Sequence, residues 1–231
     1  MAGALVVPWA LAAAAVAWWA LAEGVRQWRA GGLDAPEALL ALGWATLPGG
    51  AAWLFLGRAG IDTGYGGLVD LLTAAHFHYA GALAAVWAGL LGRTLGPRLR
   101  RVHAPLAVGL VLGFWGVAVG IALSRGPAGG SPVETVAVVV LAVSAVGLGV
   151  LALIRAGGFE SRASGGMVAI SGGSLALALG LAVWFHVGTR AGTRAPAIDW
   201  MVDRHGWLVA FGFGLWGALG WRRIRPRPAA R

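Results

Sequence analysis

Long apolar segments separated by short polar connections dominate this chain. A helix needs about 20 apolar residues to cross the hydrocarbon core of a bilayer, and seven segments meet that requirement. They are residues 4–25, 37–57, 67–91, 103–124, 133–154, 166–188 and 200–221. The connections are rich in Gly, Pro and Arg, as in RTLGPRLRR and RAGGFESRASGG. The pattern predicts an all-α integral membrane protein with seven transmembrane helices in a single membrane domain, residues 1–231.

The composition agrees with a membrane environment. Hydrophobic residues make up 58% of the sequence and charged residues 12%, whereas soluble domains are nearer one quarter charged. The net charge is +9, and all 18 basic residues are Arg. In a membrane protein we interpret them as loop anchors that face anionic lipid headgroups, so no nucleic-acid partner is expected. The sequence has no Cys, which excludes a thiolate metal site or a Cys nucleophile within it.

The arginines predict an orientation. The connections after the first, third and fifth predicted helices, together with the C-terminal tail, carry 13 Arg, against four in the connections on the other side. Because Lys and Arg accumulate on the cytoplasmic side, we expect the N-terminus outside and the C-terminus in the cytoplasm.

The chain contains an internal repeat in its uncommon residues. Each residue of the first set recurs 129 positions later: Asp70, His76, Trp87 and Arg93 match Asp199, His205, Trp216 and Arg222. The matched helices lie four apart in the chain and therefore run in the same direction. This predicts a 3+1+3 parallel repeat of residues 4–95 and 133–224 around a linker helix at 103–124. SWEET sugar transporters have a comparable pseudo-twofold axis along the membrane normal.

The repeated histidines are the leading site candidates, because ionisable residues at membrane depth by default face the bundle interior or a wet cavity. We expect His76 and His205 to line one cavity in the outer half of the membrane. At about 100° per residue, His76 and Trp87 share one stripe of their helix, whereas His78 points elsewhere, toward a neighbouring helix. Further candidates for a substrate or proton pathway are polar residues near the predicted outer helix ends: Asp70, Thr73, His78, His186, Asp199 and Asp203.

Each candidate also has a purely structural interpretation. A buried histidine can bond a backbone carbonyl, and Asp70 and Asp199 suit the positive N-terminal ends of their helices. Trp87 and Trp216 lie near the predicted inner boundary, where aromatic residues form a belt. SGGS at 171–174 matches no catalytic motif and is interpreted as a place where helices pack closely.

The motifs HFHYAG at 76–81 and HGWLVAFGFGLWG at 205–217 resemble the YndJ-like family of bacterial membrane proteins. The resemblance is concentrated in the third and seventh predicted helices and extends over the chain. The family is uncharacterised and described as transporter-like. The resemblance therefore implies that His76, His78 and His205 are the main site candidates, but it implies no particular chemistry.

Three functions remain open from the sequence. The favoured one is a small secondary transporter or permease of the bacterial inner membrane, in which His76 and His205 take up protons and no cofactor is required. The alternative is a membrane-embedded hydrolase, isomerase or cyclase that acts on a lipid or isoprenoid through His76, His78, His205 and Asp203. A zinc version of that enzyme would draw its ligands from His76, His186, His205 and Asp203. The third is a structural subunit.

Overall fold

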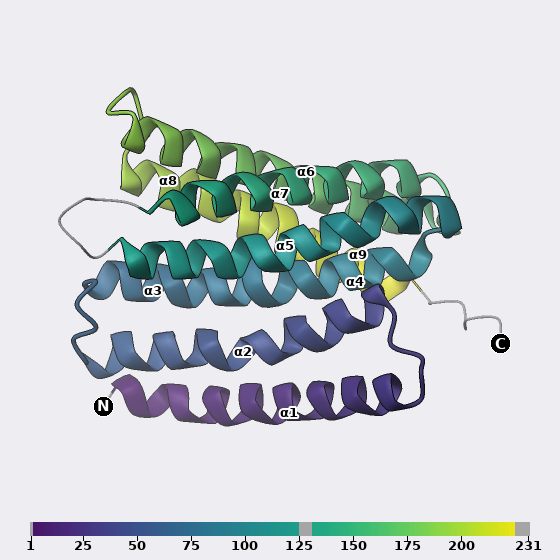
Figure 1. Ribbon diagram of the computed structural model, residues 1–231, viewed down its shortest axis with the longest axis horizontal. Helices are drawn as coiled ribbons and strands as arrows, with labels where there is room; N and C mark the ends of the chain where they lie inside the picture. The colour runs from purple at the N-terminus through teal and green to yellow at the C-terminus, as the bar shows by residue number, and fades with distance from the viewer. Residues whose placement is uncertain (1, 125–130, 225–231) are drawn as a thin grey trace. The chain divides into compact units, whose positions relative to one another are not determined.

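The computed structural model describes residues 2–124 and 131–224, and every regular element in these two ranges is a helix (Figure 1). The elements of the first part are η1 (Ala2–Val6, a 3-10 helix), α1 (Val7–Arg29), α2 (Ala35–Ala59), α3 (Gly67–His76), η2 (Phe77–Leu83) and α4 (Ala84–Thr94). Those that follow are α5 (Pro97–Leu123), α6 (Pro132–Ala156), α7 (Arg162–Arg190), α8 (Ile198–Trp207), η3 (Leu208–Leu215) and α9 (Trp216–Arg223).

Six helices in the described residues are long and apolar enough to cross a membrane. They are Ala2–Arg29, Ala35–Ala59, Gly67–Thr94, Pro97–Leu123, Pro132–Ala156 and Arg162–Arg190. The segment predicted as the seventh span is also helical, through α8, η3 and α9. It does not reach the same apolarity, because charged residues lie near both of its ends and Gly and Trp are frequent between them.

Helix starts follow local capping chemistry. Asp34 caps α2, and its side chain accepts a hydrogen bond from the Glu37 N–H. α5 begins at Pro97, six residues before the predicted start at 103. The fixed φ of Pro97 suits the first helical position, and the arginine-rich turn after Pro97 continues the helix. The prediction placed this start too late, because it followed apolarity alone.

Two compact units divide the chain, Met1–Leu90 and Leu91–Arg231. In the amino-terminal unit, α2 packs against α1 and against the α3–η2 helix (Figure 1). Small residues allow close approach: a Cβ on Gly43 would lie 2.9 Å from the Ala82 carbonyl oxygen. The core between these helices consists of Ala13, Leu47, Ala51 and Ala82.

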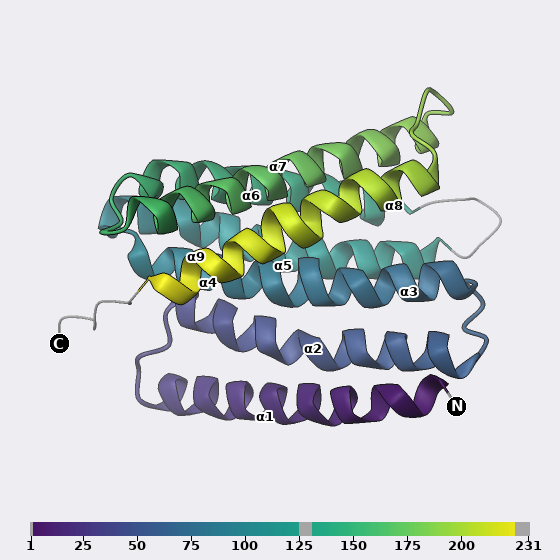
Figure 2. The ribbon, with the colours of Figure 1, turned by 180° about the vertical axis from the view of Figure 1, so that it is seen from behind.

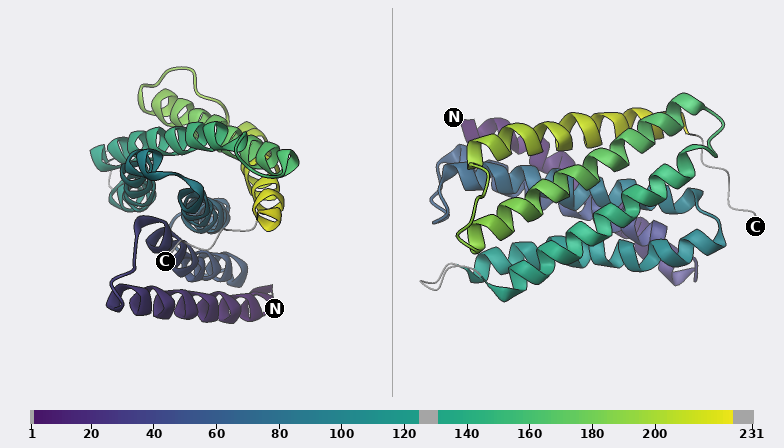
Figure 3. Two further views of the ribbon diagram at one scale, coloured as in Figure 1. Left: turned by 90° about the vertical axis from the view of Figure 1, so that its right-hand side faces the viewer. Right: turned by 90° about the horizontal axis from the view of Figure 1, so that it is seen from above.

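In the carboxyl-terminal unit, α5 packs on α6, α6 on α7, and α7 on η3 and α9 (Figures 2 and 3). Backbones meet closely along these contacts. A Cβ on Gly149 would lie 2.7 Å from the Gly172 carbonyl oxygen, and a Cβ on Gly172 would lie 3.0 Å from Ala152 Cβ. The close packing expected at SGGS is therefore confirmed for Gly172.

Both η2 and η3 are π-helices that continue directly from an α-helix and into another. η2 follows His76, and η3 begins three residues after His205. A π turn holds more residues than an α turn, so residues beyond it are displaced around the helix by about 100° for each extra residue. The stripe predicted for His76 and Trp87 assumed 100° per residue, and that spacing does not hold across η2. The His76 side chain is exposed, whereas Trp87 is 1% exposed. Its burial also argues against a place in an aromatic belt.

Candidate functional site

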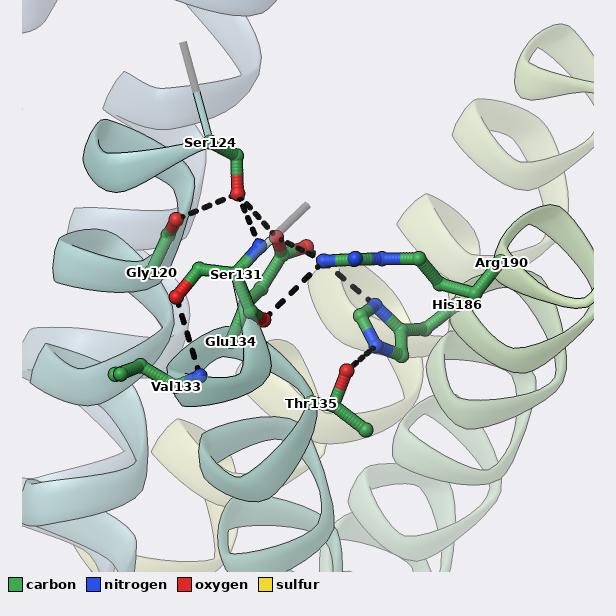
Figure 4. Close-up of polar contacts among 8 residues, drawn as sticks. All are labelled: Gly120, Ser124, Ser131, Val133, Glu134, Thr135, His186 and Arg190. Atoms are coloured by element: carbon green, nitrogen blue, oxygen red, sulfur yellow. Dashed lines mark hydrogen bonds and ion pairs between the residues drawn. The ribbon is translucent and has the colours of Figure 1, made fainter. Parts of the chain in front are cut away.

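A polar cluster joins the ends of α5, α6 and α7 (Figure 4). Its centre is Glu134 in the first turn of α6, whose side chain is 17% exposed. Arg190 Nη2 lies 2.8 Å from Glu134 Oε2. The Ser124 hydroxyl lies 3.1 Å from the same oxygen and 2.7 Å from the Gly120 carbonyl oxygen, and its single proton can serve either acceptor. The carboxylate is thus held by one cation and one hydroxyl from two other helix ends.

His186 on α7 contacts two consecutive residues of α6. Its side chain is 9% exposed, with Nδ1 3.4 Å from Glu134 Oε1 and Nε2 3.0 Å from Thr135 Oγ1. The first distance is within ion-pair range but long for a hydrogen bond, and in the second pair either atom can be the donor, depending on the tautomer. The ring therefore bridges a carboxylate and a hydroxyl.

Local sequence explains how the cluster forms. The Ser131 side chain caps α6 by accepting from the Val133 N–H at 3.1 Å, and Pro132 occupies the first helical position. The Ser131 N–H donates to the Ser124 hydroxyl at 2.8 Å, which ties the start of α6 to the end of α5. His186 and Arg190 are four residues apart on α7 and therefore share a face.

The sequence identified only His186 in this cluster. Glu134, Thr135 and Arg190 were missed, although two signals were present. Glu134 is the single acidic residue in the long apolar run of α6, and His186 and Arg190 have the i, i+4 spacing of side chains that act together.

His76 ends α3, and its Nδ1 lies 2.6 Å from the carbonyl oxygen of Leu72 one turn earlier. It belongs to the amino-terminal unit and His205 to the carboxyl-terminal unit. The pairing of these two histidines around one cavity accordingly stays a prediction.

His78 lies in η2 and faces α1, as the sequence predicted for a neighbouring helix. Its Nδ1 is 2.7 Å from the Ala74 carbonyl oxygen, and its Nε2 accepts a hydrogen bond from Trp9 Nε1 at 3.0 Å. The two rings also stack, with centroids 5.5 Å apart. With Nε2 beside the Trp9 N–H and Nδ1 beside a carbonyl oxygen, the contacts suit an N–H at Nδ1.

Gly50 provides the space for the His78 ring. A Cβ on Gly50 would lie 2.5 Å from His78 Cε1 and Nδ1. We expect Gly50→Ala to displace the ring from Trp9 and to lower the free energy of unfolding by about 1–2 kcal/mol. Thermal unfolding in detergent measures this, with Gly67→Ala as the control, because a Cβ there meets nothing within 4 Å. Equal unfolding temperatures for the two variants would contradict the expectation.

His205 lies near the end of α8, and its Nδ1 is 3.0 Å from the Ala178 carbonyl oxygen on α7. A second contact joins α7 to η3: the Ser171 hydroxyl of α7 donates to the Phe213 carbonyl oxygen in η3 at 2.7 Å, and Ser171 is fully buried. In the amino-terminal unit, therefore, the π segment receives a polar contact from α1 at His78. In the carboxyl-terminal unit, both His205 and the π segment receive polar contacts from α7.

The remaining polar candidates make local contacts. Asp70 is 3% exposed and accepts from the Thr63 hydroxyl at 2.5 Å, and the Thr73 hydroxyl donates to the Val69 carbonyl oxygen. Asp70 lies in the first turn of α3, where its charge suits the helix dipole.

Asp199 and Asp203 lie on α8, and neither is buried. Asp199 Oδ1 accepts from the Trp200 N–H at 2.9 Å, and Asp203 Oδ2 is 3.3 Å from Arg204 Nε. Asp199 lies in the first turn of α8, as its structural interpretation expects.

No three His, Asp or Glu side chains of residues 2–124 and 131–224 lie close enough together to hold a metal ion. The suggested zinc ligands make separate contacts instead: His186 with α6, His205 with a backbone carbonyl, and Asp203 with Arg204. A zinc centre built from them does not fit this arrangement.

Comparisons with known proteins place the chain among membrane proteins. A family model described as YndJ-like protein matches residues 1–213. The "Uncharacterized membrane protein YndJ" of Bacillus subtilis (strain 168) is 27% identical over 221 residues, which cover 93% of this chain and 39% of the relative. The chain thus spans about two fifths of the length of that relative. No solved structure matches it.

Proposed function

We propose a transport function for this chain, which belongs to the YndJ-like protein family. It is a membrane protein with several apolar helices. In our proposal it works as a small secondary transporter or permease in the cytoplasmic membrane of a bacterium. A small-molecule substrate enters a cavity in the outer half of the membrane that is lined by histidine and aspartate side chains.

The observation that carries the proposal is the pair of π-helical segments beside the two histidines. π segments occur frequently at functional sites, and irregular backbone at membrane depth is tolerated where protein buries it or where it lines a wet cavity. A glycine allows a close contact at each segment: Gly50 of α2 lies against the His78 ring of η2, and Gly212 within η3 lies against Ser174 of α7.

The same segments support the predicted 3+1+3 parallel repeat. Each lies in the third helix of its predicted repeat, after a histidine and before a tryptophan, Trp87 in one and Trp216 in the other. Under this proposal, residues 4–95 and 133–224 are the repeats, and 103–124 is the linker. Transporters with repeats bind substrate near the repeat interface, so the equivalent helices are the expected walls of the cavity.

The test is charge movement across proteoliposomes on a solid-supported membrane, with a panel of amino acids, sugars and organic acids. We expect a current for at least one class that grows with an inward proton gradient. His205→Ala should reduce it at least about tenfold, the effect of losing about 1.4 kcal/mol of an essential interaction.

Arg162→Gln is the matched control, because it changes an exposed charge at the start of α7, sixteen residues before Ala178, which contacts His205. A current that is indifferent both to the proton gradient and to His205→Ala would contradict the proposal. Conversion of the vesicle lipids, followed by mass spectrometry, would instead favour the enzyme.

A further inference from the structure

The Glu134 carboxylate presents its two oxygens to different partners. Arg190 and Ser124 contact Oε2, whereas Oε1 faces His186 Nδ1 at 3.4 Å. A second cation at His186 would therefore not compete with Arg190 for the same oxygen. The formal charges of Glu134 and Arg190 cancel. A protonated His186 would add one positive charge next to Glu134 Oε1, while Arg190 contacts the other carboxylate oxygen.

Thr135 makes the other side of the ring compatible with either protonation state. A hydroxyl can donate to a neutral Nε2 or accept from a protonated one without moving a heavy atom. Thr135 is an exposed residue, whereas His186 is 9% exposed.

Other charged groups on α5 and α8 lie at another helix end or contact other residues. In its described residues, α5 bears charge only in its first turns, at the opposite end from Ser124. On α8, Asp203 pairs with Arg204, and Asp199 accepts from the Trp200 N–H. Among residues 2–124 and 131–224, Glu134 on α6 and Arg190 on α7 are the charged groups drawn in contact at this site in Figure 4.

We propose that His186 is a proton-binding site, and that proton uptake there tightens the junction of α6 and α7. An incoming proton binds the lone pair of Nε2, the Thr135 hydroxyl turns so that its oxygen accepts from the new N–H, and Nδ1–H stays directed at Glu134 Oε1. The imidazolium then forms a charge-assisted contact with a carboxylate that Arg190 already holds on its other oxygen. This inference does not depend on the proposed transport.

Protonation is tested directly by nitrogen-15 NMR of the histidine rings of the full chain in detergent micelles. The His186 signals are identified by their loss in His186→Gln. Between about pH 8 and about pH 5, the range in which histidine changes charge, both ring nitrogens should move to the imidazolium positions. A ring that stays neutral over this range while the protein remains folded would overturn the proposal.

The tightening is tested with spin labels, which the absence of native Cys makes specific. Val136→Cys near the start of α6 and Val187→Cys beside His186 are both at exposed positions. The distance distribution between the labels should narrow on acidification, and it should not narrow in the His186→Gln or Glu134→Gln backgrounds. His78→Gln, in the other unit, should retain the narrowing. Narrowing that persists in His186→Gln, or its absence from the unmodified background, would overturn the second part of the inference.

Discussion

Gly120→Ala is expected to lower the free energy of unfolding by about 1–3 kcal/mol, the usual cost of overpacking a close contact. A Cβ on Gly120 would lie 2.5 Å from Glu134 Cα and Cβ and 2.6 Å from its backbone nitrogen. Because the obstacle is the backbone of α6, rotating a side chain cannot relieve the clash, and α5 and α6 must separate. The separation would also move the Glu134 carboxylate away from Ser124, which bonds the Gly120 carbonyl oxygen at 2.7 Å.

The measurement is reversible unfolding in mixed micelles, followed by circular dichroism. Gly180→Ala on α7 is the control, since a Cβ there meets nothing within 4 Å. Alanine favours a helix over glycine by up to about 1 kcal/mol, so the control should be neutral or slightly stabilising. The same stability for both variants would show that α5 and α6 do not approach at Gly120 as closely as described.

Helix positions were predictable because apolar length and capping residues are local properties of the sequence. The segment predicted at 133–154 is α6, Pro132–Ala156, and it begins with a capping Ser and a Pro in its first turn. α5 shows the limit of this reasoning. Its apolar residues begin after the arginines, but the helix already begins at Pro97, so apolarity alone placed the start six residues late.

The π segments were not predictable, since FHYAGAL and LVAFGFGL read like any apolar helical run. The extra residue per turn is accommodated by tertiary contacts. Gly50 leaves space for the His78 ring in one unit, and Ser171 satisfies the Phe213 carbonyl in the other. An argument from 100° per residue does not hold across such a segment, and the stripe predicted for His76 and Trp87 depended on it.

The Glu134 cluster was missed because the sequence was ranked by rare residues, and Glu134 has an ordinary local explanation. SPVE at 131–134 fits the capping-box pattern, in which Glu bonds the backbone N–H of the capping residue. In the structure that N–H bonds Ser124 instead, and Glu134 faces Arg190 and His186. Which partner an acidic side chain takes is decided by the neighbouring helix, and the local pattern does not contain that information.

Glu134→Ala is expected to be the most destabilising substitution of a charged residue in the carboxyl-terminal unit, by about 1–3 kcal/mol. It leaves the Arg190 guanidinium, 30% exposed, without its carboxylate. A cation that loses its partner in a largely buried site keeps its desolvation cost without the compensating attraction. The same change removes an acidic residue from the first turn of α6, where it favours the helix dipole.

Asp203→Ala provides the matched comparison, because it removes a carboxylate from an ion pair whose side chains are 65% and 55% exposed. An exposed pair contributes about 0–1 kcal/mol, so this variant should unfold almost like the unchanged protein. Unfolding in mixed micelles at high and low salt distinguishes the Glu134 cluster from the Asp203–Arg204 pair. Salt screening weakens an exposed ion pair far more than a buried one. If Glu134→Ala proved as mild and as sensitive to salt as Asp203→Ala, the Glu134 cluster would be an ordinary surface ion pair. A large effect that salt does not abolish would instead identify Glu134 as the residue that holds the ends of α5, α6 and α7 together.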